Sequence, residues 1–220
     1  MKRFFFPIGL LFLALSCSDA PAADKAATTD KQAVTTADGT SYSTDSSSLV
    51  TWTGTKPTGT HIGSFHLKEG SLTVKDNNLT AGTITIDINS LVNLDLPVEE
   101  KPKLEGHLKS PDFFDVAKYP TAKFEITSVA AFTYDSLTMK DLVMKAATHI
   151  IKGNLTLKDS TKNISFPAKV SITNEKIRAA ADFNIDRTQW GMNYKGPNNP
   201  QDWFIRKEVN LKFAITATKK

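Results

Sequence analysis

The feature that most constrains this chain is an alternation of apolar and polar residues that recurs over most of its length. Ile84, Ile86 and Ile88, for example, are separated by Thr85 and Asp87. The same pattern recurs in the segments 50–54, 63–74, 122–126, 151–157, 164–172, 177–185 and 209–215. A period of two residues predicts β-strands that bury one face and expose the other. The sequence therefore predicts an all-β domain of at least eight strands.

Short polar segments separate several of these strands. Residues 75–78, 158–161 and 173–176 have the composition of hairpin turns. Half-buried strands joined by short hairpins form either a two-sheet sandwich or a closed up-and-down barrel. The period alone does not choose between these two architectures.

Two stretches interrupt the alternation. Residues 97–115 carry Leu104 and Leu108 at helical spacing, which predicts a short helix followed by a loop. Residues 135–147 fit either a strand or a short helix.

The N-terminus is similar to an export signal. Met1, Lys2 and Arg3 precede an uncharged run over residues 4–15, which is too short to cross a bilayer because a spanning helix needs about 20 residues. Leu13 to Cys17 resembles a lipobox, so we expect residues 1–16 to be a signal peptide. Cys17 would then carry the lipid that anchors the protein in the cell envelope, facing the periplasm or the cell surface. The alternative is ordinary secretion.

Residues 17–42 differ in composition from the rest of the chain. Between positions 18 and 42, Val34 is the only aliphatic residue larger than Ala. So little apolar area does not offset the entropy of ordering a segment, which predicts a flexible tether. Residues 43–220 are long enough to form one domain with its own core. That core must stabilise the domain because Cys17, the single cysteine, excludes an intrachain disulfide.

Charge and motifs argue against several classes of function. The 27 basic residues are scattered among 23 acidic ones, with no basic stripe of the kind that binds nucleic acid. The four histidines lack metal-chelating spacing. Nucleophile and phosphate-binding motifs are also missing from the sequence. We therefore expect a protein without catalytic residues and without a metal.

Five blocks of the sequence resemble the YceI-like family. They are residues 106–115 with 119–124, residues 153–157, residues 162–167, residues 183–192, and Trp52 with residues 61–67. The resemblance runs from about residue 49 to residue 217. It implies a single closed lipocalin-like antiparallel β-barrel of about eight strands with a short helical insertion. It also implies an exported, non-catalytic protein with an elongated apolar cavity for a polyisoprenoid or similar amphiphilic lipid. No cofactor other than such a lipid is expected, and dimerisation is left open.

The strand parities supply candidate residues for the cavity wall. The candidates are the inward-facing residues Phe65, Ile84, Ile86, Phe124, Ile126, Leu155, Phe166, Phe183, Val209, Leu211 and Phe213. Each ligand CH₂ buried against them would contribute about 0.8 kcal/mol. A packed core would use the same residues, so the rival interpretation is a membrane-tethered barrel with a filled core that binds a protein partner.

Polar residues that share the apolar parity mark a candidate mouth. His61, His149 and Arg187 all lie near strand ends, and Trp190 follows Arg187 closely. Arg187 suits a polar or anionic head group, and the alternative is that it pairs with an acidic neighbour. Four large apolar residues outside the strands form either a lid or a plug: Phe113, Phe114, Trp190 and Met192.

Overall fold

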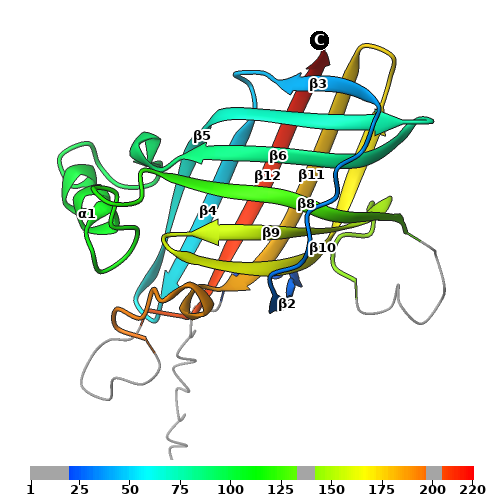
Figure 1. Ribbon diagram of the computed structural model, residues 1–220. Coiled ribbons are helices and arrows are strands. Elements are labelled where there is room, and N and C mark those ends of the chain that lie inside the picture. The colour runs from blue at the N-terminus through cyan, green and yellow to red at the C-terminus, as the bar shows by residue number, and fades with distance from the viewer. Residues whose placement is uncertain (1–19, 133–141, 197–204) are drawn as a thin grey trace, which may run out of the picture.

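The wall of the molecule is one antiparallel sheet that closes on itself (Figure 1). The computed structural model describes residues 20–132, 142–196 and 205–220. The long strands within these ranges are β4 (Leu49–Lys56), β5 (Gly59–Lys75), β6 (Asn78–Asp87), β8 (Thr121–Ala131), β9 (His149–Leu157), β10 (Ser160–Ile172), β11 (Lys176–Asp186) and β12 (Glu208–Lys219). Each pairs with the next, and β12 pairs back with β4 through Val209–Gly54 to Ala214–Leu49. This closure confirms the predicted eight-stranded barrel and excludes the sandwich.

The predicted turns are confirmed where the chain must bend tightly. Asp76 and Asn77 join β5 to β6 with positive φ angles of 51° and 60°, and Lys158 joins β9 to β10 with φ 55°. Asp and Asn tolerate this left-handed conformation better than most other residues, which fits positions 76 and 77. Residues 173–175 connect β10 to β11.

The inward parity predicted for the strands is also confirmed. Phe124 lies opposite Ile84 on one neighbouring strand and Leu155 on the other, and all three side chains are buried. Of the eleven cavity candidates, ten are buried and Val209 is half-buried. The interior of the barrel is therefore the core of the protein.

A helical insertion lies at one end of the barrel. After η1 (Ile88–Ser90) and the short strand β7 (Val92–Asn93), helix α1 spans Lys101–Lys109, which confirms the helix predicted within residues 97–115. Glu105 Oε1 accepts a hydrogen bond from the main-chain N–H of Asn93 at 2.8 Å, which connects α1 to β7. Over the described ranges no helix has the length and apolarity needed to cross a membrane. Of the ambiguous stretch 135–147, residues 135–141 lie outside the described residues and residues 142–147 form neither strand nor helix.

The N-terminal segment differs from the predicted tether. It contributes β1 (Asp24–Lys25), β2 (Ala27–Asp30) and β3 (Thr40–Thr44). Strands β10 and β11 pair directly over Lys169–Ile172 and Ile177–Ala180. Beyond that point β2 pairs with β10 and β1 pairs with β11. The segment therefore fills the seam where two wall strands separate.

Residues 24–44, here called the N-terminal strap, continue around the outside of the barrel (Figure 1). Gln32 exchanges two hydrogen bonds with the side-chain amide of Asn154 on β9, at 3.0 and 2.8 Å. The Thr35 hydroxyl donates to the Thr127 carbonyl on β8 at 2.6 Å. Strand β3 then pairs with β5 and β12. Composition missed this arrangement because backbone pairing with open strand edges, rather than apolar area, holds the strap.

Candidate functional site: an apolar chamber in the barrel

One end of the barrel encloses a chamber of about 440 Å³. Small-molecule sites have volumes of about 300–1,000 Å³, so this space is large enough for a ligand. Its wall comes from seven strands and includes Val50, Trp52, Phe65, Ile86, Ala122, Leu155, Leu157, Ile185, Val209, Leu211 and Phe213. The chamber therefore offers a ligand mainly aliphatic and aromatic contacts.

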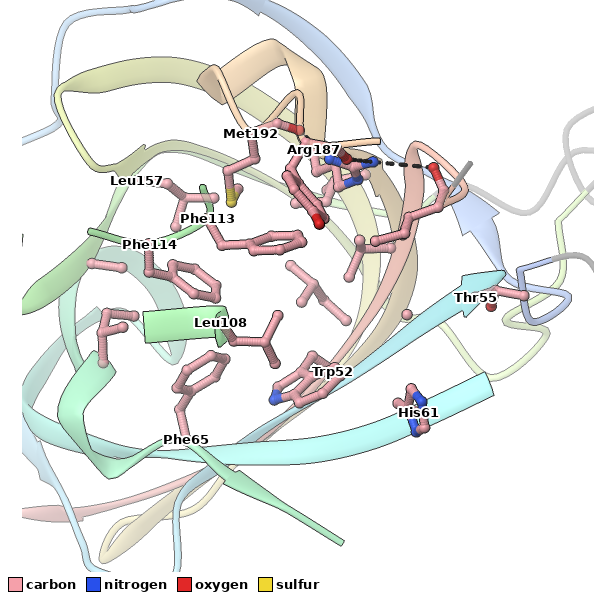
Figure 2. A pocket seen from close by; sticks show the side chains of 18 of the residues that line it. Trp52, Thr55, His61, Phe65, Leu108, Phe113, Phe114, Leu157, Arg187 and Met192 are labelled. Atoms are coloured by element: carbon pink, nitrogen blue, oxygen red, sulfur yellow. Dashed lines mark hydrogen bonds between the residues drawn. The ribbon is translucent and has the colours of Figure 1, made fainter. Parts of the chain in front are cut away.

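The helical insertion covers this chamber. Leu104 and Leu108 of α1 and Phe113 and Phe114 of the following loop line it. Figure 2 shows Leu108 near Trp52 and Phe114 near Phe65, whereas Phe113 lies on the side of Arg187 and Met192. The rings of Phe114 and Phe65 meet edge to face, with centroids 5.5 Å apart. Met192 joins them from the loop after η2 (Arg187–Trp190). These residues form a lid over an open space and do not plug it.

Aromatic contacts connect α1 to the loop after η2. The His107 ring meets Phe113 and Tyr194 edge to face, at centroid distances of 5.2 and 4.7 Å. Its Nε2 lies 3.0 Å from Asp112 Oδ2. Because the lid consists of two loops locked together in this way, its two halves are expected to move as one unit.

The rim of the chamber is polar. The hairpin between β4 and β5 contributes Thr55, Lys56, Thr58 and His61, and the loop after η2 contributes Lys195. Across the described ranges, the chamber lining contains five basic side chains and no carboxylate: Lys56, His61, His107, Arg187 and Lys195. Apolar depth and a basic rim suit a ligand with one polar end.

His61 is held at this rim by an acidic partner. Its Nδ1 lies 2.9 Å from Asp95 Oδ2. Burial raises the pKa of Asp95, but hydrogen bonds from the Ile62 amide, His61 and Asn93 outweigh it and hold the pKa below the ordinary value. Asp95 is therefore a carboxylate at neutral pH and orients His61.

Arg187 contacts backbone carbonyls rather than an acidic side chain. It is only 2% exposed, and it donates to the carbonyls of Tyr194 and Ile205 at 3.0 Å, of Arg206 at 3.2 Å and of Met192. Burial lowers its pKa, and the charge of Asp186 opposes that shift. The side chain fastens the loop after η2 to the chain that leads into β12. Arg187 also lines the chamber. Its contact with a ligand head group therefore stays a prediction.

The other two mouth candidates do not line this chamber. His149 begins β9 at the opposite end of the barrel, with Nδ1 2.8 Å from the Thr148 hydroxyl, and burial lowers its pKa. Trp190 is 1% exposed and donates through Nε1 to the Leu155 carbonyl at 2.9 Å. Residue parity identifies a face of a strand but not an end of the barrel, so it did not separate His149 from His61.

The cavity candidates divide between two spaces. Phe65, Ile86, Leu155, Val209, Leu211 and Phe213 line the chamber. Ile84, Phe124, Ile126, Phe166 and again Phe213 line a smaller cavity of about 40 Å³ further along the barrel. Phe183 lines neither space and is fully buried. Contact of any of these residues with ligand stays a prediction.

Trp52 is a chamber residue that was not among the candidates, although it shares the parity of Val50. A Cβ atom at Gly63 would lie 2.3 Å from its indole ring, so only glycine allows this ring position. Its Nε1 and the Thr55 hydroxyl are buried polar atoms with no hydrogen-bond partner in the described part of the molecule.

Over residues 20–132, 142–196 and 205–220 there is no group of three or more His, Cys, Asp or Glu side chains placed to hold a metal ion. The chamber itself offers burial of an apolar molecule, with polar contacts at its end.

Comparison with known proteins gives a family and relatives. The family model for the YceI-like domain matches residues 32–217. The UPF0312 protein of Pseudomonas aeruginosa is 36% identical over 108 residues, which cover 49% of this chain and 48% of that protein. A UPF0312 protein of Yersinia pestis is 31% identical over 109 residues. The chain thus spans about half the length of these relatives.

Two solved structures share the fold. Burkholderia cenocepacia BcnA superimposes with a TM-score of 0.59 at 18% identity, covering 78% of this chain and 97% of that one. A polyisoprenoid binding domain from Saccharophagus degradans, implicated in plant cell wall breakdown, gives a TM-score of 0.56 at 15% identity, with 81% and 98% covered. At such identities the similarity concerns the fold.

Proposed function

The chain belongs to the YceI-like domain family, and we propose that it binds an isoprenoid or similar amphiphilic lipid without catalysing a reaction on it. The observation that carries this proposal is the apolar chamber of about 440 Å³ under the lid of α1. The fold shared with a polyisoprenoid binding domain supports it.

The energetics of the chamber favour an apolar chain. Each buried CH₂ contributes about 0.8 kcal/mol, so a few isoprene units would bind without any specific polar contact. The basic rim then favours a ligand with a single polar end.

The rival function is a barrel with a filled core that binds a protein partner. Interior volume separates the two, because a filled core leaves no room for a ligand. Space on the scale of a small-molecule site supports the lipid carrier.

A blocked chamber tests this function. Val209 is half-buried and lines the chamber, whereas Lys212 on the same strand is exposed. In protein comprising residues 18–220, we expect Val209→Trp to weaken geranylgeraniol binding at least about 10-fold, because the indole occupies space that several ligand carbons would fill. Lys212→Trp should leave the affinity unchanged. Binding is measured by native mass spectrometry of protein purified without detergent.

The same preparation shows whether the proposal fails. A stoichiometric isoprenoid adduct on protein exported to a bacterial periplasm would support it. A clean apo mass, with no binding of prenyl alcohols or quinones after incubation, would count against it and favour the interaction module.

We also propose that the protein works in the cell envelope as a lipoprotein. The motif Leu13 to Cys17 supports this, with Cys17 as the lipid attachment site. Expression of the full chain in bacteria should give a mature protein that begins at a diacylated Cys17 and partitions with membranes. Cys17→Ser should abolish the lipid mass. A mature wild-type protein without lipid would contradict the anchor and leave the lipid-binding proposal untouched.

A further inference from the structure

Four phenylalanine rings cross the interior of the barrel. Phe166 on β10 and Phe183 on β11 stack with centroids 4.1 Å apart and planes 13° apart. Phe213 on β12 meets Phe183 edge to face at 5.4 Å. Phe124 on β8 lies 5.7 Å from Phe166 and 6.3 Å from Phe213. These four rings are here called the phenylalanine partition.

The partition lies between the two cavities. The chamber of about 440 Å³ ends at Phe213, and the small cavity of about 40 Å³ is lined by Phe124, Phe166 and Phe213. A Cβ atom at Gly153 would lie 2.3 Å from the Phe124 ring, so this ring reaches the interior only because residue 153 lacks a side chain. The interior is therefore two spaces separated by a wall of aromatic rings.

We propose that the phenylalanine partition is the blind end of the lipid site and limits the buried ligand chain to three or four isoprene units. This inference rests on the proposed function and adds the length class of the ligand. It makes Phe213 the residue that determines chain length, since its ring faces both spaces.

The limit follows from the chamber volume. A protein cavity of about 150 Å³ holds benzene, which has six carbons, so each carbon needs roughly 25 Å³. By that measure the chamber of about 440 Å³ holds roughly 18 carbons, or between three and four isoprene units. A longer chain must leave its remaining units outside the barrel or displace a packed ring.

Phe213 is the ring whose removal would join the two spaces. Phe183 is fully buried and Phe166 and Phe124 are 3% and 4% exposed, whereas Phe213 is 9% exposed. Removing its six ring carbons opens roughly 150 Å³ by the benzene standard. Together with the small cavity, this adds room for one to two further isoprene units.

A series of prenyl alcohols of increasing length tests the proposal. The ligands are alcohols of two, three, four, six and nine isoprene units, and affinity for protein comprising residues 18–220 is measured by native mass spectrometry. For the wild type we expect affinity to rise with each unit up to three or four and then to stay level within about threefold, since further CH₂ groups remain outside. The chain length at which the affinity stops rising is here called the break. In Phe213→Ala the break should lie one to two units further along the series.

Two further variants keep the result interpretable. Leu72→Ala enlarges the small cavity but leaves the partition intact, because Leu72 lines only that cavity, so the break should stay at its wild-type position. Phe213→Leu is a milder change in case Phe213→Ala does not fold, and it should move the break in the same direction. Circular dichroism establishes that each variant is folded.

The outcomes separate this inference from the function on which it rests. A wild-type affinity that keeps rising to nine units, or a break that Phe213→Ala leaves in place, would overturn the chain-length limit while lipid binding stands. Failure of every alcohol to bind would overturn the proposed function itself.

Discussion

Arg187→Met is expected to lower the free energy of unfolding by about 3–5 kcal/mol, because it removes the donor from four backbone carbonyls that Arg187 bridges. Each buried acceptor left without a donor costs about 1–3 kcal/mol, and water entering the site offsets part of the total. The measurement is urea denaturation followed by circular dichroism, with Arg187→Lys expected to give an intermediate loss.

The matched control for this prediction is Arg178→Met, on the strand β11 that leads into Arg187. Arg178 is exposed on β11, so its replacement should change stability by less than about 0.5 kcal/mol. Equal effects of the two substitutions would contradict the bridging role of Arg187. The affinities of Arg187→Met for a prenyl alcohol and for its phosphate add a second readout. If Arg187 contacts the head group, the variant should lose affinity for the phosphate but not for the alcohol.

Trp190→Ala is expected to be the second severe change, with a loss of about 3–5 kcal/mol, the usual cost of truncating a large buried aromatic residue. Trp190 is 1% exposed and donates to the Leu155 carbonyl. Its removal leaves both a cavity and an unpaired acceptor. Urea denaturation of the variant, followed by circular dichroism, measures the loss.

Trp190→Phe separates stability from ligand binding. This variant keeps most of the buried area and should lose less stability, and its affinity for geranylgeraniol should match the wild type because Trp190 does not line the chamber. A large fall in affinity with little loss of stability would instead assign Trp190 to the mouth.

The sequence predicted those features that depend on local backbone geometry. Alternation places Ile84, Phe124 and Leu155 on one face whatever the strand pairing, because successive side chains of a strand point to opposite sides. All three side chains are buried inside the barrel, as the alternation predicted. The helix around Leu104 and Leu108 was also predictable from its spacing.

Features that depend on closure of the sheet were not predictable from the residues alone. Barrel and sandwich differ in whether β12 pairs with β4, a contact between residues such as Leu211 and Trp52 that lie far apart in sequence. The number of antiparallel steps between β5 and β9, which the sequence pattern did not fix, places His61 at the chamber rim and His149 at the other end. The division of the interior depends on how Phe166 and Phe183 stack across two strands. The alternation of apolar and polar residues does not predict such ring contacts between strands.

The N-terminal strap determines how far the barrel can lie from a membrane. If Cys17 carries the lipid, as proposed above, only seven residue steps connect it to Asp24, where pairing with β11 begins. A fully extended chain spans at most about 3.3–3.6 Å per residue, so the reach is about 25 Å. A free tether over residues 17–42 would reach more than three times as far. The strap would therefore keep the barrel wall close to the bilayer surface and limit the directions in which the chamber can point.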